Sequence, residues 1–253
     1  MIRYKRAGGF TIIEMMLSMA FVGALLVAIA TTSLHIMRTY TRGVTIREVN
    51  QSGRTITEDI QRTIASTTPF SVVPKTGASD DPIDSRYVEK AGQGGRLCTG
   101  SYTYAWNYGS TRQLGGESYD PEHPAKPVYN IYTTPNNGFI RFAKVRDVGG
   151  MLCVNANDQR IDVNQTKELL PPGDRDLAIQ SLTVSIAPQG RDNVSGQALY
   201  YISLVIGTND DAQLNASHTA CLPPNLGEGG EHFCAINQFN IIARAGNRSG
   251  SLQ

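Results

Sequence analysis

A single acidic side chain stands at the start of a long uncharged stretch. Glu14 is followed by positions 15–37, which contain no Asp, Glu, Lys or Arg. A charged side chain at the centre of a bilayer costs roughly 2.5–3.5 kcal/mol, and buried charges are tolerated when they are paired. A plain signal sequence or anchor has no need of such a group. Glu14 is therefore a candidate for a specific pairing with a cation.

Four cysteines lie beyond this stretch: Cys98, Cys153, Cys221 and Cys234. We expect this part of the chain to be exported, and thiols oxidise to disulfides in exported proteins. Four cysteines allow three pairings. We favour Cys221–Cys234, which closes a short loop rich in Pro and Gly, and hence Cys98–Cys153. The shorter bridge would stabilise the fold by on the order of 3 kcal/mol.

Two histidines stand close to cysteines and raise zinc as the alternative: His218 precedes Cys221 by three positions, and His232 precedes Cys234 by two. The second spacing is tight and export favours oxidation, so we expect no metal site. The polar groups at 80–81 and 209–211 lack the alternating ligands of a calcium loop. The sequence has no Ser/His/Asp constellation, phosphate loop or HExxH motif. We therefore expect a protein that is not an enzyme and has no cofactor.

The composition indicates a folded protein and argues against a nucleic-acid binder. The 253 residues are 40% apolar and 18% charged, as in a folded chain of one or two domains. Lys and Arg number 23 against 22 Asp and Glu, a net charge of +1. Three of the basic residues stand in positions 1–9, so the rest of the chain leans acidic. This balance excludes a broad basic surface, and we expect no direct nucleic-acid site.

The uncharged stretch is long enough to cross a membrane. As a helix, positions 15–37 would measure about 35 Å, against a hydrocarbon core of about 30 Å. Arg3, Lys5 and Arg6 precede it, and the positive-inside rule then leaves the N-terminus in the cytoplasm. We therefore expect a single-pass protein of the cytoplasmic membrane, with everything after about Thr39 outside it.

Residues 5–14, KRAGGFTIIE, resemble the signal of type IV pilins, with basic residues, Gly, Phe, Thr, two aliphatic residues and Glu before an uncharged span. The resemblance implies cleavage between Gly9 and Phe10 by a prepilin peptidase and N-methylation of Phe10. It implies that Glu14, the fifth residue of the mature chain, pairs with the amine of Phe10 in its own chain or a neighbour. The implied partners are other pilin or pseudopilin subunits, the peptidase, an inner-membrane assembly platform and the membrane.

Two other interpretations compete with this one. An ordinary secretory signal would be cleaved after the apolar run, where Ala28, Ile29 and Ala30 fit a small-x-small site loosely. An uncleaved anchor would make the chain a single-pass, membrane-anchored ligand-binding or adhesin-like protein outside the cytoplasm. Neither explains Glu14 together with the residues around Gly9, so we favour the pilin-like interpretation.

One long helix is predicted from Thr11 to about Thr67, because no proline occurs before Pro69. Beyond the membrane, residues spaced by three and four form one stripe on this helix: Ile46, Val49, Gly53, Ile56, Ile60 and Ile64. We expect the stripe to pack on a globular head, with Gly53 allowing a strand to approach closely. The stretch 53–62 also resembles W-type minor pilins and J-type minor pseudopilins.

The rest of the chain has the patterns of strands and turns. The predicted strands are 102–108, 128–133, 139–145, 182–186, 197–206 and 236–243. The strand at 197–206 is apolar on both faces, which predicts a central position. A turn at 135–138 predicts a hairpin, and 74–96 and 109–127 are predicted loops. The alternating aromatics at 102–108 fit sheet core better than an exposed glycan-binding or adhesive platform.

Together these features predict an α+β protein with the type IV pilin fold, in which one long N-terminal helix packs on a mainly antiparallel sheet. The expected parts are a leader at 1–9, a transmembrane half-helix at 10–38, an amphipathic half-helix at 39–67, a β-rich head at 68–245 and a tail at 246–253. We expect a minor, low-copy or tip subunit of a type IV pilus or a type II secretion pseudopilus. Such a subunit moves from the membrane into a cell-surface or periplasmic filament.

Overall fold

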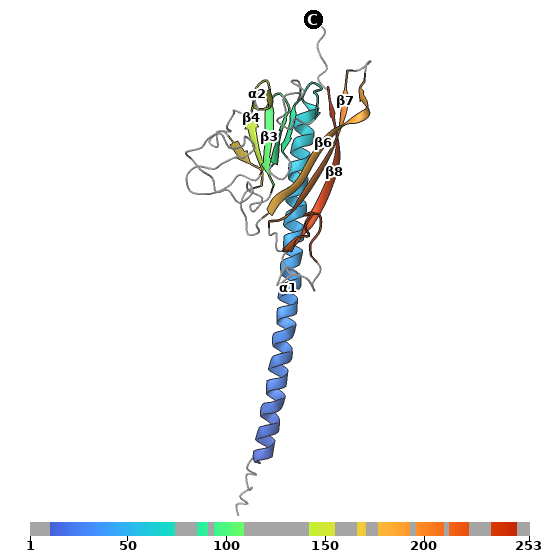
Figure 1. The fold of residues 1–253 in the computed structure, drawn as a ribbon. Helices are drawn as coiled ribbons and strands as arrows, with labels where there is room; N and C mark the ends of the chain where they lie inside the picture. Colours follow the sequence, from blue (N-terminus) through green and yellow to red (C-terminus); the bar gives the residue numbers. More distant parts are fainter. Residues whose placement is uncertain are drawn as a thin grey trace, which may run out of the picture.

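The computed structural model describes residues 11–73, 85–90, 94–108, 142–154, 166–170, 177–192, 196–209, 213–222 and 234–246. Several predicted parts lie outside the described residues: the leader at 1–9, Phe10, the loop at 109–127, the strand at 128–133, the turn at 135–138 and the tail beyond Gly246. The described chain is α+β, as the sequence predicts. A long N-terminal helix contacts two antiparallel sheets (Figure 1).

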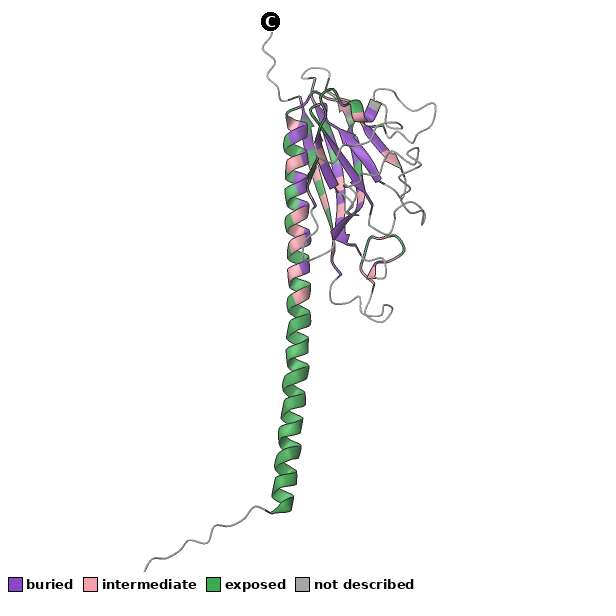
Figure 2. Ribbon diagram, turned by 90° about the vertical axis from the view of Figure 1, so that its left-hand side faces the viewer, coloured by how far each residue is buried: buried purple, intermediate pink, exposed green. Residues whose placement is uncertain are grey.

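Helix α1 (Ile12–Ala65) is continuous. It begins after Thr11, whose Oγ1 accepts the N–H of Glu14 at 3.3 Å, and no proline interrupts it. It ends shortly before Pro69, close to the predicted boundary. At 1.5 Å per residue the helix is about 80 Å long. Its C-terminal part lies against the head, while its N-terminal part extends away from it (Figure 2).

Two antiparallel sheets form the described part of the head, with the strand orders β1–β2–β3–β4–β5 and β6–β7–β8. The elements are β1 (Tyr87–Lys90), β2 (Gly94–Cys98), β3 (Tyr102–Asn107), β4 (Phe142–Arg146), α2 (Met151–Val154), β5 (Thr166–Glu168), β6 (Leu177–Arg191), β7 (Ala198–Thr208) and β8 (Ile236–Ala245). A parallel bridge between Tyr108 and Ile179 joins the sheets. The hydroxyl of Tyr87 donates to the Leu182 carbonyl at 2.8 Å and ties β1 to β6.

The loop predicted at 74–96 is wrong over its last part, which contains β1 and the start of β2. The strand β2 was not predicted because it begins with Gly94 and Gly95, and glycines in a sequence suggest a turn. Gly95 instead pairs with Trp106 of β3, and a Cβ on it would lie 2.5 Å from the indole Cζ2. The glycine therefore makes room for the largest side chain of the core. The sequence also gave no signal for α2, which is only four residues long.

Strand β7 lies between β6 and β8, so its predicted central position is confirmed. Although the strand is apolar on both faces, burial alternates along most of its length. Tyr200 and Ile202 are buried on the inner face, which α1 contacts, whereas Leu199 and Tyr201 are 40% and 42% exposed on the outer face. β6 runs well beyond the predicted 182–186 and pairs with β7 through two irregularities in register.

The core lies between α1 and the two sheets. Trp106 is fully buried between Tyr87 and Phe142, with ring centroids 6.1 and 6.3 Å away. Tyr104 is fully buried as well, and Tyr108 is 5% exposed. Of the alternating aromatics at 102–108, Tyr104, Trp106 and Tyr108 are therefore sheet core, as preferred from the sequence, whereas Tyr102 is 39% exposed.

The four cysteines form two disulfides. Cys98–Cys153 joins β2 to α2, and Cys221–Cys234 closes the segment that leads into β8. This is the pairing that loop length favoured. It also removes the zinc alternative, because all four thiols are consumed and none remains to bind a metal as thiolate.

Candidate functional site: the exposed half of the long helix and its seat on the head

The N-terminal half of α1 presents an apolar surface on every side. All side chains from Thr11 to Tyr40 are exposed, including those of Phe21 and Leu25 (Figure 2). Within the described residues, α1 is the one helix that is long and apolar enough to cross a membrane. An apolar surface of this extent does not remain in water, so lipid or other protein chains must cover it.

The polar side chains of this half bond within the helix. Ser18, Thr31 and Thr32 donate their hydroxyl protons to backbone carbonyls of the preceding turn at 2.8–3.0 Å. In hydrocarbon an unsatisfied hydroxyl is costly, whereas one bonded within the helix is not. These three residues therefore fit a lipid environment as well as a helix-packed one.

Glu14 stands in the first turn of α1. Its backbone N–H is bonded to Thr11, so Thr11 and Glu14 occupy the two positions of a capping box. A carboxylate at this position is stabilised by the positive end of the helix dipole. No described residue pairs with the Glu14 side chain. Its predicted partner, the amine of Phe10, and the predicted cleavage site after Gly9 lie outside the described residues.

The predicted stripe lies against the head over most of its length. Val49, Gly53, Ile56, Ile60 and Ile64 are buried, whereas Ile46 is 42% exposed at the lower rim of the head. The pattern did not reveal that Thr45, Thr57 and Thr63 are buried beside the stripe. Each donates its hydroxyl proton to the carbonyl four residues earlier, which makes a polar side chain compatible with the core.

Gly53 lets β8 come close to the helix. A Cβ on Gly53 would lie 2.1 Å from Cε2 of Phe239, so the phenyl ring occupies the space that a side chain would need. One further bond holds the same strand, because Nε2 of Gln61 donates to the Ile242 carbonyl at 2.8 Å. The helix and β8 are thus joined by interlocking shape and by a direct hydrogen bond.

A polar cluster joins α1 to the first sheet. Lys144 of β4 places Nζ 2.8 Å from Oδ2 of Asp59, and the Tyr104 hydroxyl donates to the same oxygen at 2.7 Å. Nζ also lies 4.5 Å from the ring centroid of Tyr102. Burial tends to raise the pKa of Asp59, but the hydrogen bonds from Lys144 and Tyr104 outweigh it and hold the pKa below its usual value. No local pattern in the sequence pairs Asp59 with Lys144, because the two residues are 85 positions apart.

Comparison with known protein families, curated proteins and solved structures finds no match for this chain. What the chain is can therefore be inferred only from its own sequence and structure. A long N-terminal apolar helix packed on antiparallel sheets is consistent with a pilin-like fold. The membrane-capable helix and the two disulfides indicate a membrane-anchored protein whose head lies outside the cytoplasm. Among the described residues, no group of three or more His, Cys, Asp or Glu side chains could hold a metal.

Proposed function

We propose that the chain is a minor, low-copy subunit of a type IV pilus or a type II secretion pseudopilus. The observation that carries this proposal is the division of α1. One half is exposed and apolar on all sides, and the other is built into the head without a break between them. A helix of this kind can leave lipid for a bundle of similar helices while its head stays folded. The proposal includes no enzymatic activity.

The proposed route begins in the membrane. A prepilin peptidase cuts between Gly9 and Phe10, and Phe10 is N-methylated. The apolar half of α1 remains in the bilayer until neighbouring subunits replace lipid around it. Glu14 then pairs with the positive amine of Phe10 in its own chain or a neighbour, because an ion pair is tolerated in an apolar bundle where a single charge is not.

The head supports a low-copy or tip position. It is large relative to the helix that it covers, contains two disulfides, and exposes Leu199 and Tyr201 on the outer face of β7. A tip subunit presents its head to a surface or to a secreted substrate and does not need to repeat along a shaft. The head is held rigidly at the end of a stiff helix, which suits that position.

Mass spectrometry of the chain purified from membranes tests the proposal. The expected product begins at a methylated Phe10, and Gly9→Val should leave the full precursor because the protease cleft admits no side chain there. Gly8→Val is the matched control and should be processed. An unprocessed wild-type chain that still functions would favour the alternative, a single-pass protein whose head binds a ligand or acts as an adhesin.

A further inference from the structure

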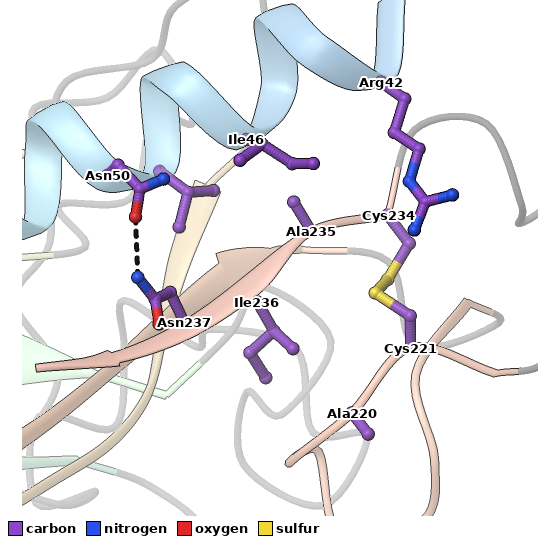
Figure 3. A pocket seen from close by; sticks show the side chains of 10 residues that line it. Arg42, Ile46, Asn50, Ala220, Cys221, Cys234, Ala235, Ile236 and Asn237 are labelled. Atoms are coloured by element: carbon purple, nitrogen blue, oxygen red, sulfur yellow. Dashed lines mark hydrogen bonds between the residues drawn. A yellow bond between two sulfur atoms is a disulfide. The ribbon is translucent and has the colours of Figure 1, made fainter. Parts of the chain in front are cut away.

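A hollow of about 370 Å³ lies between α1 and the segments at 220–221 and 234–237. Arg42 and the Cys221–Cys234 disulfide stand at one end of it (Figure 3). At the other end, Nδ2 of Asn237 donates to Oδ1 of Asn50 at 2.6 Å. Between the two ends, the lining is apolar: Ile46, Val49, Ala235 and Ile236. The hollow thus combines one cation, amides and an apolar wall.

The hollow lies where α1 leaves the membrane. Arg38 is the first charged residue after Glu14, and Arg42 follows one helical turn later, about 6 Å along the axis. Thr45 is the first buried side chain of α1, so the head begins within one further turn. The headgroup layer on each side of the hydrocarbon core is roughly 5–8 Å thick. Arg42 is therefore at the depth of lipid phosphates on the head side of the bilayer.

The charge at this depth favours an anion. Arg38, Arg42 and Arg47 follow one another, and no Asp or Glu occurs between Glu14 and Glu48. The Arg42 side chain is exposed, and no described carboxylate pairs with it. A guanidinium donates in a planar fork that matches phosphate oxygens. Arg42 lines the hollow, whereas Arg47 does not.

We infer that the hollow binds the phosphate headgroup of an anionic phospholipid in the leaflet on the head side of the membrane. Arg42 takes the phosphate, the amide of Asn50 donates to a glycerol or phosphate oxygen, and Ile46 with Ile236 covers the first methylenes. The bound lipid holds the head close to the bilayer while the subunit waits there. This binding depends on membrane anchoring and not on filament formation.

Native mass spectrometry of the full chain, released from nanodiscs of phosphatidylcholine and phosphatidylglycerol, tests the inference. The wild type should retain phosphatidylglycerol in preference to phosphatidylcholine. Arg42→Gln should lower that retention roughly fivefold, the equivalent of about 1 kcal/mol for one basic residue at an anionic surface. Arg47→Gln is the control for charge, because it removes the same charge about 7.5 Å further along the helix and outside the hollow, and it should change retention little.

A second variant tests the hollow without changing charge. Ala220→Phe fills space at its wall, and it should weaken retention while both disulfides stay intact by mass. Equal losses in Arg42→Gln and Arg47→Gln, or full retention in both Arg42→Gln and Ala220→Phe, would overturn the inference. Displacement of the lipid by millimolar inorganic phosphate would overturn it too, because the hollow would then be a site for a free anion.

Discussion

Lys144 Nζ lies 2.8 Å from Oδ2 of Asp59, so an ion pair joins β4 of the first sheet to the helix. The two side chains are 16% and 30% exposed, and Tyr104 donates to the same carboxylate oxygen. The pair therefore lies at the border of the core, where water screens it only in part. Its net contribution to stability is on the order of 1 kcal/mol after that screening.

The Asp59 pair predicts a loss of stability in acid. The pKa of Asp59 in the folded protein lies below its usual value, so the carboxylate stabilises the fold at pH values above its ordinary titration range. This stabilisation disappears as the pH falls through the lower folded pKa. Asp59→Asn should lower the free energy of unfolding by about 1 kcal/mol at pH 7. Urea unfolding in detergent at pH 7 and near pH 3 should show the difference from wild type shrinking in acid. Glu58→Gln, on the exposed neighbour, should show no comparable effect.

A side chain at position 53 should clash with the ring of Phe239. Gly53→Ala should destabilise the fold by about 1–3 kcal/mol through overpacking against Phe239, less the roughly 1 kcal/mol that alanine gains in helix propensity. Gly43→Ala has open space around its Cβ and should be neutral or stabilising. Thermal unfolding measures both.

The same pair can be examined in a double-mutant cycle. Phe239→Ala alone removes packing, but combined with Gly53→Ala it should cost less than the sum of the two single changes, because the added methyl occupies the space of the ring. Additive costs would show that Gly53 and Phe239 do not interact as the structure places them.

Two roles are proposed for Glu14, that of a helix cap and that of a charge partner in the filament, and substitutions can separate them. Glu14→Val should insert normally, because it removes a charge from the membrane span, but its incorporation into filaments should fall roughly tenfold, the equivalent of about 1.4 kcal/mol. Glu14→Gln keeps a capping side chain without the charge. Immunoblots of sheared filaments against the membrane pool should show the same loss for both variants. Normal incorporation of Glu14→Gln would mean that the residue acts as a helix cap alone.

The two disulfides should differ in their contribution and accessibility. Cys98–Cys153 spans 55 residues and Cys221–Cys234 spans 13, so loop entropy predicts losses of about 4 and 3 kcal/mol when each pair is replaced by serine. Cys98 and Cys153 are fully buried, whereas Cys221 is partly exposed. Stepwise reduction followed by alkylation should therefore label Cys221 and Cys234 first. Earlier labelling of Cys98 would contradict the burial of that bridge.

Periodicity predicted the elements whose partners lie along the chain. The absence of proline predicted α1, and the spacing of its apolar residues identified Val49, Ile56, Ile60 and Ile64 as its buried side. The alternation at 102–108 identified β3. In each case the side chains that decide the structure recur at the period of the element itself, so a short window contains the signal.

Partners far apart in sequence could not be predicted this way. The pairing of Asp59 with Lys144 spans 85 residues, and Gly95 admits Trp106 only because β2 and β3 are neighbours. The exposed outer face of β7 was also missed, because apolar residues such as Leu199 and Tyr201 do not reveal which sheet faces remain uncovered. Such features depend on how the sheets are arranged, which no local pattern contains.

The seat of α1 on the head also determines how the molecule responds to a pull along the helix axis. The buried residues from Val49 to Ile64 line up parallel to that axis, so tension on the apolar half loads their contacts in shear and all at once. Contacts loaded in shear resist force better than contacts peeled apart in turn. The Phe239 ring fills the space beside Gly53, so sliding of α1 along β8 would push larger helix side chains against the ring. Extraction from a bilayer can therefore transmit force to the head without unfolding it.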